Sequence, residues 1–158
     1  MPHEWRRDGY VISTDPARVD VDVVHAFLTH DSYWARGIAR GVVARSIEHS
    51  LVFGVYHEGG GGAQAGFARA ITDRATIAYV ADVFVLPAHR GRGLGVWLME
   101  CMRAHPDLQG LRVWRLATLD AHGLYEKQGF SPLAHPERLM EIIDPDVFAG
   151  EAPEGRAT

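Results

Sequence analysis

The stretch from Val83 to Met102 constrains the fold most, because an apolar strand there runs through a proline and a glycine-rich turn into an amphipathic helix. Pro87 ends the strand, since proline has no backbone N–H to donate to a sheet. The apolar residues that follow the turn recur at the spacing of one helical face, at Leu94, Trp97, Leu98, Cys101 and Met102. This order predicts a helix that packs back onto a sheet.

The glycine-rich turn is suited to an anion. Gly91, Gly93 and Gly95 allow a tight turn and leave backbone N–H groups unobstructed. The helix that follows adds about half a unit of positive charge at its N-terminus, which favours a pyrophosphate. The spacing is not the dinucleotide-binding pattern, and no lysine follows the glycines as in a Walker loop. The alternative is a turn before a packed helix that binds nothing.

Hydrophobic periodicity predicts the other elements. Strands are predicted at Tyr10–Ser13, Leu51–Tyr56, Ala65–Thr72, Thr76–Leu86, Arg112–Thr118 and Leu139–Ile143. Further helices are predicted at Val19–Thr29, Arg40–Ser50 and Ala121–Lys127. Strands that lead into helices, mixed with hairpins, predict an α+β fold, in which a partly antiparallel mixed sheet of about six or seven strands is flanked by about four helices.

Composition limits the class of protein. A chain of 158 residues with 47% hydrophobic residues predicts one globular domain, over residues 1–145, with a C-terminal tail over 146–158. The net charge of −4 argues against nucleic acid or an anionic membrane as partner. No run of about 18 apolar residues suggests a membrane span. The sequence leaves open whether the protein is a monomer or a homodimer.

The histidines and the cysteine predict neither metal nor disulfide. Nine histidines include no pair at the HxxxH spacing of helical metal ligands, so no metal site is expected. Cys101 is the single cysteine and is expected to be a buried small hydrophobe. The single cysteine, together with a polar N-terminus that lacks a signal peptide pattern, favours a cytoplasmic location.

The residues of the turn carry a resemblance to a family. Arg90-Gly91-Arg92-Gly93-Leu94-Gly95 fits the R-x-x-G-x-G signature of the GNAT superfamily of acyl-CoA-dependent N-acyltransferases. The strand that ends in Val83–Pro87 resembles the family's cofactor-binding strand, and Leu124–Phe130 resembles its later L-Y-x-x-x-G-F motif. The resemblance implies a GNAT-like fold and a transfer of acetyl from acetyl-CoA, in a ternary complex, to a primary amine of a small molecule or peptide.

The resemblance also implies the cofactor contacts. The main chain of the strand would pair with the pantetheine amides, at Val83, Phe84 and Val85. Backbone N–H groups of the turn would hold the pyrophosphate, at Gly91, Arg92, Gly93, Leu94, Gly95 and Val96. The side chains of Arg90 and Arg92 would add charge beside the phosphates, although loop arginines are more often only solvated.

Catalysis of this kind needs an acid, a base and a donor to the thioester oxygen. Tyr125 matches the family's general acid, and its alternative role is to pack the short helix on the sheet. Asp82, and His122 one helical turn before Tyr125, are candidate bases, although either could be structural. The backbone N–H of Phe84 or Val85 is the expected donor to the oxygen.

Other positions are expected to build the acceptor side. Asp31–Gly37 and Ala134–Arg138 would form the pocket, in which Tyr33 and Trp34 would offer an aromatic wall and Arg36 would pair with a substrate carboxylate. The alternative for Tyr33 and Trp34 is to anchor their loop to the core. Thr118 stands where many relatives have an asparagine, and Asp120 is expected to be the helix N-cap.

Two rival functions remain from the sequence. A non-catalytic acyl-CoA-binding or sensing module would keep the glycine-rich turn without the acid and base. A nucleotide-binding or interaction module is a third possibility, weakened by the absent Walker lysine and by the acidic charge balance.

Overall fold

The computed structural model describes residues 1–148, and its sheet has six strands that lie side by side in chain order. The strands are β1 (Glu4–Arg7), β2 (Tyr10–Ser13), β3 (Leu51–His57), β4 (Ala63–Thr72), β5 (Ile77–Val85) and β6 (Val113–Arg115). Neighbours from β1 to β5 are antiparallel, whereas β6 runs parallel to β5. The predicted mixed, partly antiparallel sheet is confirmed.

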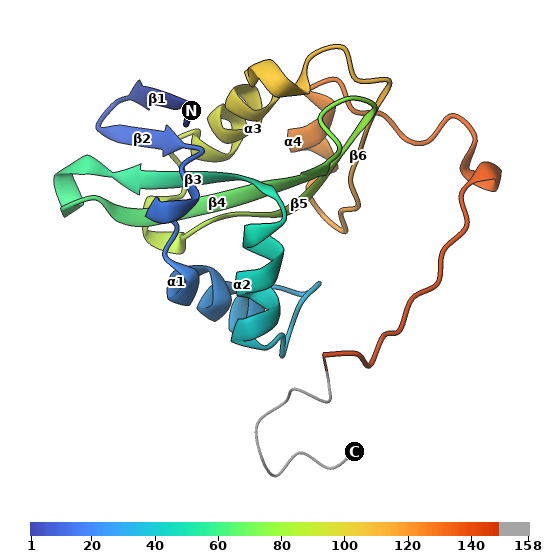
Figure 1. Cartoon of the computed structure of the whole chain (residues 1–158), viewed down its shortest axis with the longest axis horizontal. Coiled ribbons are helices and arrows are strands. Elements are labelled where there is room, and N and C mark those ends of the chain that lie inside the picture. Colours follow the sequence, from blue (N-terminus) through green and yellow to red (C-terminus); the bar gives the residue numbers. More distant parts are fainter. Residues whose placement is uncertain (149–158) are drawn as a thin grey trace, which may run out of the picture.

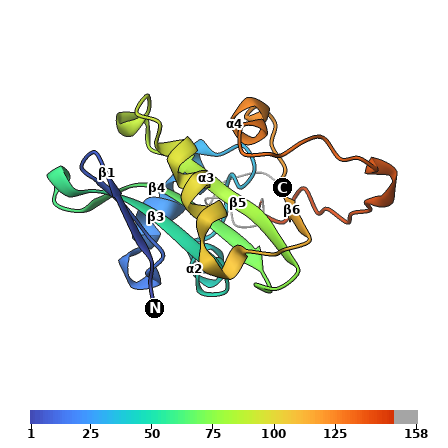
Figure 2. The same cartoon turned by 90° about the horizontal axis from the view of Figure 1, so that it is seen from above.

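In the described part of the chain, four α-helices cover the two faces of the sheet. They are α1 (Val21–Ala26), α2 (Arg40–Glu48), α3 (Leu94–Ala104) and α4 (His122–Glu126). Helices α1 and α2 lie against one face, and α3 and α4 lie against the other (Figures 1 and 2). The predicted α+β fold with about four helices is therefore confirmed.

Each face has its own hydrophobic core. The predicted stripe of α3 is buried with Phe53 and Val55 of β3, which point to the same face. Helices α1 and α2 bury Val24 and Val43 against Phe84 on the opposite face. Full burial of such a side chain contributes about 1.5–3 kcal/mol, so these stripes fix both helix layers to the sheet.

Cys101 lies within the α3 stripe. It is buried, is not in a disulfide, and burial raises the pKa of its thiol to about 12. The expectation of a small buried hydrophobe is confirmed.

Two segments near the N-terminus differ from the prediction. Strand β1 was not predicted, because its residues are mostly charged and exposed, yet it pairs with β2 along its full length. The hairpin turns at Asp8 and Gly9, which have φ of 51° and 82°. Asp-Gly is a strong two-residue hairpin signal, so the turn is the feature that sequence reasoning missed. The first helix also ends early and continues as a π-turn over Phe27–Asp31.

The predicted strand at Leu139–Ile143 is wrong. These residues have no regular secondary structure and are exposed. The orange-red segment that contains them leaves the body of the molecule after α4 and runs through solvent (Figure 1). A short apolar run becomes a strand only beside a partner strand, and within residues 1–148 no strand pairs with the segment.

The C-terminal tail lies partly beyond the described residues. Residues 149–158 of the predicted tail fall outside them, and the boundary of the single domain at residue 145 stays a prediction. Within residues 1–148, no helix is long and apolar enough to cross a bilayer.

Candidate active site

The cavity lined by four of the predicted side chains, those of Tyr33, Trp34, Asp82 and Tyr125, opens where β5 and β6 separate. The two strands pair only at Ile77–Val113, Ala78–Trp114 and Tyr79–Arg115. Strand β5 continues to Val85, whereas the chain after Arg115 turns away toward α4. A cavity of about 580 Å³ lies at this opening, and its lining includes Tyr33, Trp34, Arg69, Asp82, Thr118 and Tyr125.

Asp82 is placed in the cavity by an irregularity of β5. The register between β4 and β5 shifts between Phe67 and Arg69, and Asp82 has a φ of 54°. A left-handed conformation is uncommon for a residue other than glycine, and strain of about 1–3 kcal/mol persists where surrounding contacts fix it. Bulges of this kind re-aim side chains beside active sites.

Two side chains, those of Trp34 and Arg69, supply contacts to Asp82. One carboxylate oxygen accepts a hydrogen bond of 2.8 Å from Trp34 Nε1, and the other accepts one of 2.6 Å from Arg69 Nε. Arg69 also donates from Nη1 to Ser50 Oγ. The side chains of Arg69 and Asp82 are only 16% and 9% exposed. The ion pair therefore ties the Trp34 loop and the β4–β5 bulge into one wall of the cavity.

Tyr125 forms the opposite wall, on α4. It is 9% exposed, and burial raises the pKa of its phenol to about 12, with smaller contributions from Tyr33 and Asp120. The phenol is therefore protonated at neutral pH and can donate a proton. Phe130 packs edge-on against its ring, at 6.0 Å between ring centres, and helps to hold it in place.

The loop before α4 is held by hydrogen bonds. Tyr33 Oη accepts from the backbone N–H of Leu119, at 2.7 Å. The expected N-cap, Asp120, is wrong, because the cap position is Ala121, which has no side-chain cap. Thr118 Oγ1 instead accepts from the Ala121 N–H, at 3.0 Å. Thr118 thus shapes the turn into α4 within the lining of the cavity.

His122 lies one turn before Tyr125 on α4. It is exposed, and it lines an adjoining groove of about 310 Å³ together with Tyr125, Thr118 and Phe130. The structure therefore places both candidate bases in cavities that Tyr125 also lines: Asp82 in the β5–β6 opening, and His122 in the groove beside it.

The glycine-rich turn presents the first turn of α3. Gly91 and Gly93 have φ of 79° and 75°, and a Cβ on either would meet nothing within 4 Å. The N-cap of α3 is Gly93, whose position has no side-chain cap. The first N–H groups of a helix have no partner within it, so those of Leu94, Gly95 and Val96 can receive an anion.

The arginines of the turn have different surroundings. Arg90 donates from Nε to the Val85 carbonyl, at 2.9 Å, so its side chain is held against the end of β5. Arg92 is exposed. Burial lowers the pKa of His89, with smaller contributions from His57 and from the positive charge of Arg92. His89 in turn is hydrogen-bonded to Tyr10, at 2.8 Å, which anchors the turn to β2.

The residues present fit acetyl-CoA. The open N–H groups of α3 lie at one end, and the free edge of β5 leads from there to the cavity with Tyr125. The Val85 carbonyl points away from β4 and accepts from Arg90. The Phe84 carbonyl points toward β4, because its oxygen lies 2.8 Å from the place that a Cβ on Gly66 of β4 would occupy. Because N–H and C=O of one residue in an antiparallel strand point the same way, the Val85 N–H also faces the open edge.

Two predicted acceptor features lie elsewhere. Arg36 is exposed and is not part of the cavity lining. Ala134 and Arg138 line a separate groove that includes Val113 and Trp114 of β6, so the expected contribution of 134–138 to the acceptor pocket stays a prediction. Arg69 was missed by sequence reasoning, because only the register of β4 against β5 shows that it meets Asp82.

Comparison with known proteins identifies the family. A family model described as the acetyltransferase (GNAT) domain matches residues 48–132, which include β4, β5, the glycine-rich turn, α3 and α4. The chain belongs to the GNAT acetyltransferase family. A protein of Gibberella zeae assigned as an acetyltransferase is 34% identical over 145 residues, which cover 80% of this chain and 81% of that protein.

Solved structures of this family have the same fold. A crystal structure from Xanthomonas campestris, assigned to the GNAT family, is 47% identical, with a TM-score of 0.86 over 91% of this chain and 99% of that one. A structure from Deinococcus radiodurans, assigned as an acetyltransferase, has a TM-score of 0.68 at 19% identity over 93% and 96% of the two chains, and so shows the fold alone.

Proposed function

We propose that this GNAT protein transfers the acetyl group of acetyl-CoA directly to a primary amine of a small molecule or peptide. One observation carries the proposal: the opening between β5 and β6 holds a buried tyrosine, a buried carboxylate and a free strand edge that leads to the anion-binding turn of α3. Acetyl-CoA, when bound, supplies an activated acetyl thioester.

In this proposal the chain binds the two ends of acetyl-CoA by its backbone. The N–H groups from Gly91 to Val96 receive the pyrophosphate, and Arg92, which is exposed beside them, adds positive charge. The edge of β5 over Val83–Val85 pairs with the pantetheine amides as a further strand would. The Val85 N–H is the donor to the thioester oxygen, since the backbone carbonyl of Phe84 faces β4 instead of the open edge.

The acceptor loses a proton to the chain before it attacks. Asp82 is the proposed base, because it lines the cavity that Tyr33 and Trp34 form, and His122 is the alternative from the adjoining groove. As the new N–C bond forms, the nitrogen loses its second proton to water, the C–S bond breaks, and the electron pair of that bond goes to sulfur. Tyr125 donates its phenolic proton there, which its raised pKa keeps available at neutral pH.

Replacing Tyr125 with phenylalanine tests the acid. General acid catalysis contributes about 10²–10⁴-fold, so Tyr125→Phe should lower kcat by at least about 10²-fold while the KM for acetyl-CoA changes little. Tyr56→Phe is the matched control, because Tyr56 is a buried tyrosine of β3 outside the cavity. An unchanged kcat for Tyr125→Phe would exclude the acid role.

Calorimetry separates the proposal from its rivals. Binding of CoA in preference to ATP is expected, and preference for ATP would favour a nucleotide-binding module. Tight binding of acetyl-CoA without release of free thiol in the presence of any amine would favour a non-catalytic binder.

A further inference from the structure

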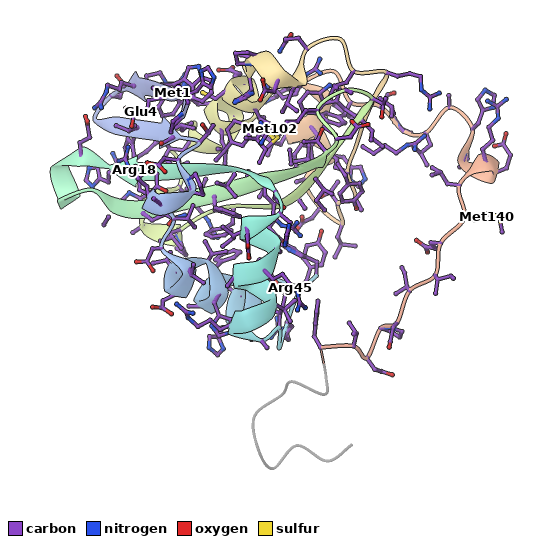
Figure 3. The ribbon with its side chains drawn as sticks, viewed as in Figure 1. Met1, Glu4, Arg18, Arg45, Met102 and Met140 are labelled. Atoms are coloured by element: carbon purple, nitrogen blue, oxygen red, sulfur yellow. The ribbon has the colours of Figure 1, made fainter. Side chains whose placement is uncertain are left out.

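The exposed apolar side chains of residues 2–132 gather in one cavity. Every large apolar side chain that is exposed within this range lines the β5–β6 opening, and these residues are Tyr33, Trp34, Ile71, Tyr79 and Leu119. The other exposed apolar side chains lie at the N-terminus or after residue 132, as Met140 does on the extended segment in Figure 3. Apolar side chains that stay exposed together in a cavity mark a place where a ligand binds.

These side chains offer mainly apolar and aromatic surface. Ile71 and Tyr79 stand opposite each other on β4 and β5, and neither belongs to the hydrophobic cores on the two faces. The rings of Tyr33 and Trp34 lie edge-on, at 5.0 Å between ring centres. The polar atom of each already has a partner in the chain, at the Leu119 N–H and at Asp82. Ring faces and an aliphatic side chain therefore remain for an occupant.

The charges of the lining favour a cation over an anion. Within the described lining, Arg69 is the only cationic side chain, and it is already bonded to Asp82 and Ser50. Asp120 is a further carboxylate of the lining, is exposed, and is in no ion pair among residues 1–148. A carboxylate on the acceptor would meet like charge and no available cation, whereas an ammonium group would be attracted.

The order of residues along β5 gives the acceptor a direction. In the proposed reaction the thioester oxygen lies at Val85 and the amine lies at Asp82. Tyr79 is three residues farther from the thioester, which is roughly 10 Å of strand at about 3.3 Å per residue. An acceptor whose amine lies at Asp82 therefore extends over Tyr79 and Ile71, a distance that an aromatic ring on a short alkyl chain spans.

We propose that the acceptor is a small arylalkyl monoamine without a carboxylate. Its ring packs on Tyr79 and Ile71, with the ring of Trp34 beside it. Asp120 attracts its ammonium group to the opening. The cavity of about 580 Å³ is of the size that small ligands occupy. This inference rests on the proposed acetyl transfer and narrows its acceptor from primary amines in general to this class.

Steady-state kinetics with two matched pairs of amines gives the first test. Ethylamine lacks the ring of 2-phenylethylamine, and one methylene in a hydrophobic pocket is already worth about 10–200-fold, so its kcat/KM should be at least about 10²-fold lower. L-Phenylalanine differs from L-phenylalaninamide by its negative charge, and its kcat/KM should also be at least about 10²-fold lower. Equal values within either pair, or a lysine peptide preferred to 2-phenylethylamine, would overturn the proposal.

A charge added to the lining should change this preference. Ile71→Arg supplies a cation inside the cavity, and Ile71 is 45% exposed, so the change leaves the core closed. The kcat/KM for phenylalanine relative to phenylalaninamide should rise about ten-fold, since a hydrogen bond to a charged group forms. Ala75→Arg is the matched control, because Ala75 is exposed between β4 and β5 and lies outside the lining. The same ratio in both variants would contradict the proposal, since a structural effect lowers both rates alike.

Calorimetry in the presence of CoA separates this inference from the proposed function. 2-Phenylethylamine should bind, and ethylamine and phenylalanine should bind at least about ten-fold more weakly. Selective binding without acetylation would support the acceptor class and exclude acetyl transfer. Acetylation of other amines only would support acetyl transfer and overturn the acceptor class. Neither binding nor acetylation of 2-phenylethylamine would also overturn it.

Discussion

Replacing Arg69 with methionine leaves Asp82 charged and buried in the wall of the cavity. The pair is joined at 2.6 Å, and its side chains are 16% and 9% exposed. Removing one partner of a buried pair costs about 3–5 kcal/mol, and we take the lower value of about 3 kcal/mol because some exposure remains. At roughly 2–4 °C per kcal/mol, Arg69→Met should lower Tm by about 6–12 °C.

The assay is thermal unfolding followed by circular dichroism. Arg74→Met is the matched control, because Arg74 pairs with Asp107 where both side chains are about half exposed, and an exposed pair is worth at most about 1 kcal/mol. Arg69→Met/Asp82→Asn should regain part of the lost stability, since the asparagine carries no charge and can still accept from Trp34. The reasoning would be refuted if Arg69→Met lost no more stability than Arg74→Met, or if Arg69→Met/Asp82→Asn were no more stable than Arg69→Met.

Three further changes test other parts of the site and the fold. Gly93→Ala places a side chain at a φ of 75°, where an L residue costs roughly 1–2 kcal/mol, so CoA should bind about ten-fold more weakly by calorimetry, whereas Gly41→Ala in α2 should not change the affinity. Asp82→Asn should reduce kcat more than His122→Gln if Asp82 is the base, and the reverse order in steady-state kinetics would assign His122. Burial raises the pKa of Tyr56 from 10.0 to about 12, so its stabilising contribution is complete below pH 10 and is lost as pH rises toward 12. In urea unfolding, the free energy of unfolding of Tyr56→Phe should therefore fall less over that pH range than that of the wild type. An equal fall in the two proteins would contradict the burial effect.

The parts of the fold that depend on residues close together in the sequence were predictable. The stripe of α3 and the glycine-rich turn could be inferred without the structure, because the spacing of the apolar residues and of the glycines is visible in the sequence. The positive φ of Gly91 and Gly93 agrees with that inference. The charged β1 could not be inferred from hydrophobic pattern, because its place comes from the Asp8–Gly9 turn and its pairing with β2.

The wrong strand at Leu139–Ile143 has a different cause. Its run of apolar residues is typical of a strand, but pairing depends on a neighbour, and in the described chain no strand pairs with this segment.

Several side chains that line the candidate cavity were named from the sequence, but their arrangement was not. The family motif located Tyr125 and the turn, because their spacing along the chain is fixed. The Arg69–Asp82–Trp34 network depends on the β4–β5 register and on a loop distant in sequence, which no local pattern encodes.

Detection of the acetylated product tests the central claim most directly. The full chain would be incubated with acetyl-CoA and a panel of primary amines, both small molecules and peptides, and the products would be identified by mass spectrometry. Acetyl transfer at the β5–β6 opening predicts at least one N-acetylated amine, formed at least about 10²-fold more slowly by Tyr125→Phe and at the wild-type rate by Tyr56→Phe. Acetyl-CoA bound tightly with no amine acetylated, or equal rates for the wild type and Tyr125→Phe, would contradict it.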